Sequence, residues 1–259
     1  MITEDLKMFP VERQQAIIQI LKTKKSMTVI ELSKTLFIGE ATIRRDLEKL
    51  AKANLLQRTH GGAVLEEGLD REIPLAVRET AQIGAKNRIG TLAAQFVHDG
   101  DTIIIDSSST SLKMVAVLRT KERLTVITNG AKAVIELGES HFARVYCTGG
   151  ILRENSLSFI GQQARVSIEN YSADYLFFSC RGLSIEKGLT DSSEDEAELR
   201  RVMAQNSRKV ILLCDHTKFD TVSFCKVMDF KAIHCLITDQ KPDSRWTEFL
   251  HAKGIQVLY

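Results

Sequence analysis

Several features that mark other classes of protein are missing from this chain of 259 residues. No apolar run approaches the roughly 20 residues that a bilayer-spanning helix needs, and the first ten residues carry acids without an apolar core. We therefore expect a cytoplasmic protein with no membrane contact. The sequence contains no G-x-x-x-x-G-K-[ST] phosphate loop and no H-E-x-x-H pair, and its six histidines show no ligand spacing. We predict no metal site and no cofactor.

The cysteines also lack the patterns of stabilising cross-links. They are five in number, are never spaced as C-x-x-C, and lie mostly in apolar runs such as VILLC and IHCLI. This usage favours buried, reduced thiols over disulfides or a metal site.

Basic charge is present but confined to the N-terminus. Residues 1–65 hold 11 Lys and Arg against 7 Asp and Glu, whereas the remainder holds 24 against 26. A local excess of this kind suits contact with a polyanion, although it falls short of a long basic arm. Because the chain also exceeds the usual size of one domain, we predict two.

Two short helices are predicted in the basic region. Pro10 suits the first position of a helix over about residues 10–23, in which Ile17 and Leu21 recur at helical spacing. After a KTKKSM turn, Thr28 caps a second helix with an apolar face that includes Leu32.

A third helix, within EATIRRDLEKLAKANLL, has two distinct faces. Ile43, Leu47 and Leu50 form its apolar back, and its front carries Thr42, Arg45, Lys49 and Lys52. Cations and a small hydroxyl near the helix N-terminus are what insertion into a DNA major groove requires. Arg44 is more ambiguous, because Glu40 and Glu48 lie four residues to either side.

An extended stretch, LLQRTHGGAVL, follows the third helix. We predict a β-wing in which Gly61 and Gly62 take positive φ angles at a two-residue turn and Arg58 and His60 face the DNA backbone. The alternative for the third helix is an ordinary solvated surface helix. Three helices followed by a hairpin within some 55 residues favour a winged helix-turn-helix.

These residues resemble the DeoR family of bacterial repressors, whose hallmark is a TIRRDL recognition helix followed by an R-x-HGG wing. Residues 42–47 and Arg58, His60, Gly61 and Gly62 match it position by position. Gly39 departs from the family's usual Ser at the start of the recognition helix. Glycine is an acceptable N-cap but offers no hydroxyl, which implies weaker DNA affinity and leaves the fold unaffected.

A linker over residues 66–75 separates domain 1–65 from domain 76–259, which begins with a helical stretch to about residue 97. Short apolar runs then alternate with helical segments, and they read TIIID, LTVIT, ARVYC, YLFFSC, KVILLC, IHCLIT and IQVLY. This alternation predicts an α/β domain with a mostly parallel sheet covered on both faces. In such sheets ligands bind at the carboxyl ends of the strands.

Polar or glycine-rich loops follow four of these strands. Ser107–Ser111 opens a helix, so its hydroxyls and the free amides of the helix start form either an anion site or a Ser-rich turn with an ordinary cap. Lys218 neutralises a phosphate or pairs with Asp215. The remaining loops are Asn129–Gly130 and Thr148–Gly150. We favour a shared pocket.

The resemblance covers nearly the whole chain, and it implies that the second domain is a phosphosugar sensor related in fold to ribose-5-phosphate isomerase. The effector contacts that it implies are Asp106, Ser107, Ser108, Ser109, Thr110, Thr128, Asn129, Gly149, Gly150 and Lys218. The family loop more often reads DSGTT, so Ser108 replaces a glycine and alters which ligand fits.

A sugar-phosphate isomerase is the rival interpretation, since one fold can support different functions. Related isomerases carry acids in an Asp-Gly-Ala-Asp stretch after the strand that corresponds to YLFF, where this chain has Ser179-Cys180-Arg181-Gly182. Acids from Asp191 to Glu196 lie nearby, but an acidic helix start is usually capping. We therefore predict no enzyme.

The predicted mechanism is repression of a carbohydrate catabolism operon. The second domain assembles the chain into a dimer or tetramer, so that several winged helices engage repeated half-sites of double-stranded operator DNA. A phosphorylated sugar then favours an arrangement that no longer matches the operator spacing.

Overall fold

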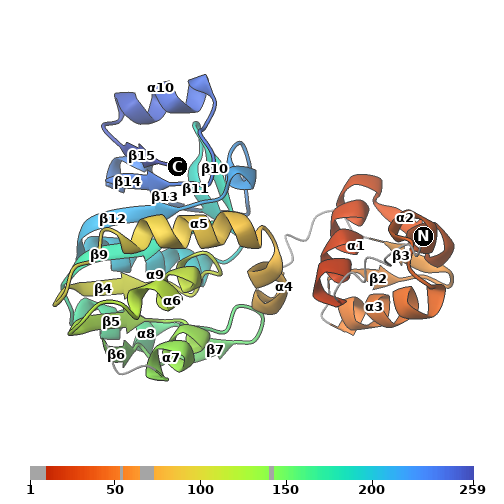
Figure 1. The fold of residues 1–259 in the computed structure, drawn as a ribbon, viewed down its shortest axis with the longest axis horizontal. Coiled ribbons are helices and arrows are strands. Elements are labelled where there is room, and N and C mark those ends of the chain that lie inside the picture. Colours follow the sequence, from red (N-terminus) through yellow and green to blue (C-terminus); the bar gives the residue numbers. More distant parts are fainter. Residues whose placement is uncertain (1–9, 53–54, 65–72, 140–142) are drawn as a thin grey trace, which may run out of the picture. The chain divides into compact units, whose positions relative to one another are not determined.

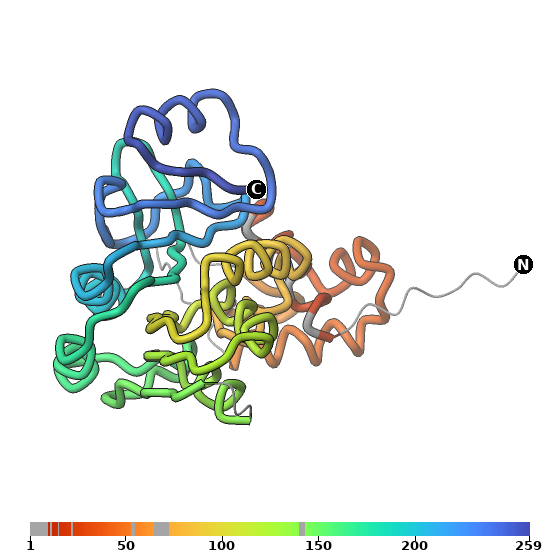
Figure 2. Tube along the Cα trace, turned by 60° about the vertical axis from the view of Figure 1, so that its left-hand side comes forward, coloured from red at the N-terminus to blue at the C-terminus, as the bar shows by residue number. Residues whose placement is uncertain are grey.

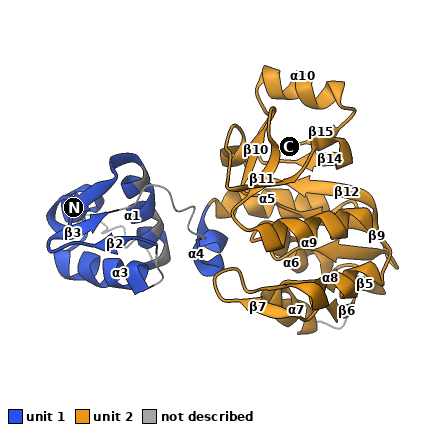
Figure 3. Cartoon of the chain, turned by 180° about the vertical axis from the view of Figure 1, so that it is seen from behind, with its two compact units in different colours: residues 1–81 blue, residues 82–259 orange. Residues whose placement is uncertain are grey.

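The computed structural model describes residues 10–52, 55–64, 73–139 and 143–259. The chain divides into two compact units, residues 1–81 and 82–259 (Figure 3). Most of the predicted linker lies outside the described residues, so its bounds remain a prediction.

The helical stretch predicted to begin the second domain is two helices. Helix α4 (Leu75–Thr80) belongs to the first unit and α5 (Ile83–Ala94) to the second. Ala81 between them is extended and Gln82 has a left-handed backbone, so the helix hydrogen bonds cannot continue through them.

The first unit contains the three predicted helices, α1 (Pro10–Lys24), α2 (Val29–Leu36) and α3 (Glu40–Lys52). Thr28 caps α2 as predicted, and the Glu31 side chain completes a capping box by accepting from the Thr28 amide at 2.8 Å. Ile43 and Leu47 on α3 are fully buried, which confirms its apolar back.

The wing is a three-stranded antiparallel sheet in the order β1 (Ser26–Thr28), β3 (Gly62–Val64), β2 (Gln57–Arg58). The turn differs from the prediction. The Thr59 amide donates to the Gly62 carbonyl at 3.1 Å, which places His60 and Gly61 in the turn, and neither glycine has a positive φ. Gly62 is required for another reason: a Cβ there would lie 2.1 Å from the Met27 carbonyl oxygen.

The second unit is built on a seven-stranded sheet whose strands are all parallel (Figure 1). Its order is β15-β14-β12-β9-β4-β5-β6. The seven apolar runs predicted as strands all lie in this sheet. They are β4 (Thr102–Ile105), β5 (Leu124–Thr128), β6 (Ala143–Cys147), β9 (Ala173–Phe178), β12 (Ser207–Leu213), β14 (Cys235–Ile237) and β15 (Gln256–Leu258).

Helices cover both faces of this sheet because alternate strand residues point to opposite faces. Ile103 and Ile105 pack with α5, α6 (Met114–Leu118) and α7 (Ala131–Gly138). Ile104 packs in the cluster formed with α8 (Gln162–Glu169), α9 (Glu194–Gln205) and α10 (Ser244–Ala252). The tube in Figure 2 follows the chain from the green strands of one half of the sheet to the blue strands of the other.

Several shorter elements lie between the strands of the large sheet in the sequence. They were not predicted. A hairpin pairs β7 (Ile151–Arg153) with β8 (Ser158–Ile160). A small antiparallel sheet has the order β10-β11-β13. Its strands are β10 (Gly182–Ser184), β11 (Gly188–Asp191) and β13 (Cys225–Met228), and the 3-10 turns are η1 (Ser111–Lys113), η2 (His216–Lys218) and η3 (Phe230–Ala232).

All five cysteines are free thiols, as predicted. Cys180, Cys214 and Cys235 are buried, Cys225 is half-buried, and Cys147 is exposed, so the expected burial is wrong for the last. Within the described ranges, none of the helices combines the length and apolarity that a membrane span requires. Those ranges also contain no group of three His, Cys, Asp or Glu side chains placed to hold a metal ion.

Candidate functional site

Helix α3 presents a polar, basic face to solvent. Arg45 and Lys49 are exposed and Thr42 is half-buried. Arg44 pairs with Glu40 at 2.9 Å between Nη2 and Oε2, which confirms one of the two ion pairs considered from the sequence. The structure assigns no ion pair to Arg45 or Lys49 with any residue that it describes, so both cations remain available to an external anion.

The orientation of α3 depends on a buried ion pair that the sequence did not reveal. Asp46, on the apolar side of α3, is 1% exposed and pairs with Arg13 of α1. Gln14 Nε2 donates to the other carboxylate oxygen at 3.1 Å. Arg13 and Asp46 are 33 residues apart in the sequence, and only the fold brings them together.

Arg58 and His60, the predicted wing contacts, are both exposed. The wing is tied to the start of α2 by a hydrogen bond from the Val29 amide to the Gly61 carbonyl at 2.8 Å. The structure therefore brings the start of α2 and the wing turn into direct contact, with α3 packed against α2 in the same unit.

The second candidate site lies where the sheet changes direction. From β4 the chain adds β5 and β6 on one side and then β9, β12, β14 and β15 on the other. The loops after β4 and β9 therefore diverge at a topological switch point, which is where ligands bind in open parallel sheets. The predicted Ser107–Ser111 segment is the loop after β4.

Part of this loop is committed to holding its own shape. Asp106 accepts from the Ser108 amide at 3.1 Å, and Ser108 Oγ accepts from the Ser111 amide at 3.1 Å. The amides of Leu112 and Lys113 donate to carbonyls of the same segment. The expected free amides at a helix start are thus wrong for residues 111–113, because a 3-10 turn closes there.

Three hydroxyl side chains of the loop remain unused. Ser107, Ser109 and Thr110 are buried, with 7, 4 and 2% exposed area. None of the three hydroxyls has a hydrogen-bond partner in the part of the chain that the structure describes. Their oxygen atoms are not among the buried atoms without partners, so the three hydroxyls reach solvent and are open to a ligand.

The loop after β5 lies against the loop after β4. A Cβ on Gly130 would lie 3.1 Å from Ser107 Cα, and Thr128 Oγ1 accepts from the Gly130 amide at 3.0 Å. Asn129 is 3% exposed; its Nδ2 donates to the Phe159 carbonyl at 3.2 Å, whereas its buried Oδ1 has no partner in the described chain. Asn129 is therefore a stronger candidate contact than Thr128.

The structure gives less support to three other predicted effector contacts, Gly149, Gly150 and Lys218. Gly149 and Gly150 both have positive φ, and a Cβ on Gly150 would lie 2.4 Å from the Ile160 carbonyl oxygen, so Gly150 serves chain packing. Lys218 ends η2 after β12, and the structure shows no ion pair between it and Asp215, which instead caps the Thr217 amide at 3.0 Å. Contacts with a ligand stay predictions for all three residues.

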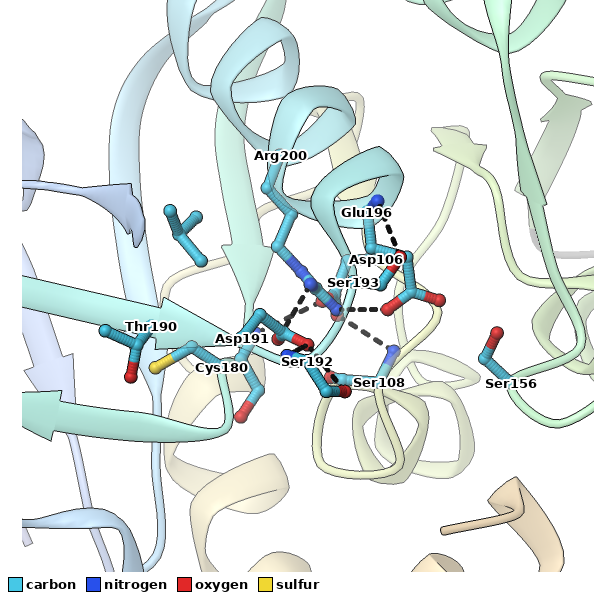
Figure 4. Close-up of polar contacts among 12 residues, drawn as sticks. Asp106, Ser108, Ser156, Cys180, Thr190, Asp191, Ser192, Ser193, Glu196 and Arg200 are labelled. Atoms are coloured by element: carbon cyan, nitrogen blue, oxygen red, sulfur yellow. Dashed lines mark hydrogen bonds and ion pairs between the residues drawn. The ribbon is translucent and has the colours of Figure 1, made fainter. Parts of the chain in front are cut away.

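A buried cluster of charged side chains contacts the loop after β4 at the switch point (Figure 4). Arg200 of α9 donates to Asp106 at 3.0 Å, to Asp191 at 2.9 Å and to Glu196 at 3.4 Å. Glu196 also accepts from Ser158 Oγ at 2.6 Å, which links the β7–β8 hairpin to the cluster. Asp106 binds Arg200 and the amides of Ser108 and Ser179, so it positions the loop after β4, and its contact with an effector stays a prediction.

The charges in this cluster stabilise one another. Burial favours the neutral form of Glu196, but the charge of Arg200 and the Ser158 hydroxyl outweigh it and hold the pKa of Glu196 at about 2. Burial also works to lower the pKa of Arg200, yet Asp191 and Asp106 raise it above its ordinary value. Glu196 and Arg200 are therefore both charged at neutral pH.

Most of this cluster could not be predicted from the sequence. The acids from Asp191 to Glu196 have the pattern of ordinary capping at a helix start. The cap is Ser193, whose side chain accepts from the Glu196 amide, while Asp191 and Glu196 hold Arg200. The sequence does contain one sign of the cluster: Arg200 follows Glu196 by four residues, and this spacing predicts that the two side chains meet on one face of a helix.

A basic helix packed beside a β-wing, followed by a separate parallel α/β unit with polar loops at its switch point, defines a DNA-binding transcriptional regulator with a sensor domain. Residues 13–68 match the family model for the DeoR-like helix-turn-helix domain, and residues 81–240 match the model for the DeoR C-terminal sensor domain. The chain belongs to the DeoR family of transcriptional regulators.

Named relatives extend over the full chain. It is 40% identical to the uncharacterized HTH-type transcriptional regulator YulB of Bacillus subtilis, with 96% of each chain covered. It is 32% identical to the HTH-type transcriptional repressor GlcR of the same organism, covering 97% of this chain and 96% of that one. Both are named as regulators of transcription.

Among solved structures, the ribose-5-phosphate isomerase A of Methanocaldococcus jannaschii aligns with a TM-score of 0.38 and 13% identity, covering 52% of this chain and 53% of that one. A similarity this distant says nothing about activity.

Proposed function

We propose that this protein is a repressor of a carbohydrate catabolism operon that binds double-stranded operator DNA and is controlled by a phosphorylated sugar. The proposal of DNA binding rests on two exposed cations of α3, Arg45 and Lys49, which form no ion pair with any described residue. They lie in a unit that matches a helix-turn-helix family. Thr42 and Arg44 on α3, with Arg58 and His60 on the wing, complete the proposed DNA contacts.

The sensor half rests on the unused hydroxyls of Ser107, Ser109 and Thr110, together with Asn129 Oδ1. Phosphate oxygens accept hydrogen bonds from hydroxyls, and a sugar hydroxyl can donate to an amide oxygen. One phosphorylated sugar thus offers a partner for every group in this set. Gly149 and Lys218 are proposed as outer contacts of the same ligand.

An isomerase would need a carboxylate base beside the substrate. The buried carboxylates nearest the switch point, Asp106, Asp191 and Glu196, are all paired with Arg200. At about 2, the pKa of Glu196 is far below that of an effective base. These pairings favour a sensor over an enzyme.

A single recognition helix reads only a few base pairs, so we propose that the protein acts as a dimer or tetramer that binds repeated half-sites. The effector would then act by favouring the arrangement in which the DNA-binding units do not match the operator spacing.

DNA binding is tested with the promoter region beside the protein's own coding sequence, titrated over a range of salt concentrations. Arg45→Ala should weaken binding and flatten the log–log salt dependence by roughly one unit per lost phosphate contact. Arg208→Ala is the control, because Arg208 is exposed in the second unit. Unchanged affinity and slope for Arg45→Ala would remove this residue from the interface.

Effector binding is tested by thermal shift with a panel of hexose and pentose phosphates and the corresponding free sugars. A phosphate ester at a hundred times its dissociation constant should add about 2.7 kcal/mol to the apparent stability. Ser109→Ala should lose this response while keeping DNA binding. If free sugars stabilise the protein equally well, the effector is not recognised by its phosphate.

A further inference from the structure

Arg181 lies three residues beyond the end of β9, in the loop at the switch point. Its backbone is fixed, because its amide donates to the Thr190 carbonyl at 3.0 Å. Its side chain is half-buried, and its Nη2 atom is buried without a hydrogen-bond partner. The guanidinium has no ion pair with any residue that the structure describes.

Two other arginines near this site, the buried Arg200 and the half-buried Arg153, show the usual pairing of a guanidinium with carboxylates. Arg200 binds three carboxylates. Arg153 Nη1 also lacks a well-directed hydrogen bond, but it faces Glu196 Oε1 at 3.2 Å, so its charge is paired. A buried guanidinium nitrogen ordinarily has a hydrogen-bond partner, so Nη2 of the half-buried Arg181 marks a place for a partner that is not part of the protein.

The position of Arg181 identifies where that partner would bind. Ser179, two residues earlier, donates its amide to Asp106 at 3.3 Å, so the loops after β9 and β4 are in contact. The three unused hydroxyls lie on the loop after β4, and Asn129 Oδ1 lies on the loop after β5. The unsatisfied groups therefore occupy the carboxyl ends of three consecutive strands, β9, β4 and β5.

We propose that Arg181 binds the anionic group of the effector, and that it, rather than Lys218, supplies the positive charge of the site. This inference rests on the proposed sensor function. A guanidinium presents a planar fork of donors that matches two oxygens of a phosphate or carboxylate, and the hydroxyls of Ser109 and Thr110 add uncharged donors. Asn129 Oδ1 then accepts from a hydroxyl of the same ligand, so the ligand class is a hydroxylated organic anion.

The test uses the full chain and its Arg181→Gln, Arg181→Lys, Ser109→Ala and Lys218→Gln variants. Binding of inorganic phosphate and of the sugar phosphate panel is measured by thermal shift and calorimetry. We expect Arg181→Gln to raise the dissociation constant about tenfold to a hundredfold, with Arg181→Lys intermediate and Lys218→Gln raising it less than Arg181→Gln does. Arg165→Gln is the matched control, since Arg165 is half-exposed and pairs at the surface with Glu169.

A structural role for Arg181 makes the opposite prediction for the free protein. Because Arg181 lacks a carboxylate partner, Arg181→Gln should leave the melting temperature without ligand unchanged or raise it. A large loss of unliganded stability would overturn the inference.

The binding outcomes separate the two proposals. If Arg181→Gln binds as the wild type does while Ser109→Ala does not, the inference is wrong and the sensor function stands. If only Arg181→Gln loses ligand binding, the result supports the inference and removes the serine loop from the site. If no anion of the panel binds the wild type, both proposals fall.

Discussion

Arg200 holds Asp106 at 3.0 Å across 94 residues of sequence, and this contact ties helix α9 to the loop after β4. The same guanidinium reaches Asp191 at 2.9 Å. One buried cation thus sets the position of segments from three parts of the second unit.

Replacement of Arg200 by Met should destabilise the second unit by about 3–5 kcal/mol, because it leaves buried carboxylates without their counter-charge. The measurement is calorimetric unfolding of the full chain. Arg208→Met is the control, since Arg208 is exposed and its contact with Asp174 is long, at 3.6 Å. If Arg200→Met lowers the free energy of unfolding no more than the control does, the cluster adds nothing to stability.

Glu196 should make stability depend on pH in the acid range. Its folded-state pKa of about 2 lies below the ordinary 4.5, so its ionised form stabilises the protein above about pH 4.5, and this contribution is lost as the pH falls towards 2. The shift corresponds to roughly 3 kcal/mol. Urea unfolding between about pH 6 and pH 3 measures it.

Glu196→Gln is the comparison for that measurement, since the amide keeps the shape and cannot ionise. Its unfolding free energy should fall less steeply with acid than that of the wild type. Parallel curves for the two proteins would show that another group carries the dependence.

Gly62→Ala should destabilise the wing by about 1–3 kcal/mol, because the added Cβ would overlap the Met27 carbonyl oxygen and force β1 and β3 apart. Hydrogen exchange of the β3 amides in the full chain measures the local opening free energy. Gly61→Ala should be close to neutral, as nothing lies within 4 Å of a Cβ at that position. Equal effects of the two substitutions would contradict the proposed overlap.

Gly39→Ser should stabilise α3 by a few tenths of a kcal/mol. The Gly39 carbonyl already accepts from the amides of Thr42 and Ile43, so the residue stands at the N-cap, and a Cβ there meets nothing within 4 Å. Hydrogen exchange of the first α3 amides would detect the change. Faster exchange in the variant would mean that the serine hydroxyl does not cap the helix.

Most of the fold could be predicted because its elements have strong local patterns. The β-strands of the large sheet are continuous apolar runs, and α3 repeats Ile43, Leu47 and Leu50 at helical spacing. Three-residue strands without a continuous apolar run, such as β1 and β10, carry too little pattern to be recognised. They form because other segments approach them, as Gly62 approaches Met27.

The candidate site could be predicted less completely. Its loops were found because the carboxyl ends of parallel strands meet at one edge of a sheet. Which side chains in them are already paired depends on long-range contacts, so the sequence could not separate Ser108, which caps its own turn, from Ser109, which does not. Arg181 could not be predicted as a contact, because no short-range pattern shows that its guanidinium lacks a partner among the described residues.

Because Asp106, Ser108 and Arg200 lock the loop after β4 before any ligand arrives, binding there costs little conformational entropy. A binding loop that is already ordered favours tight ligand binding at low metabolite concentration. Under the proposed function, ordering of this loop would then not be the signal to the DNA-binding unit, and a movement elsewhere in the proposed oligomer would have to carry it.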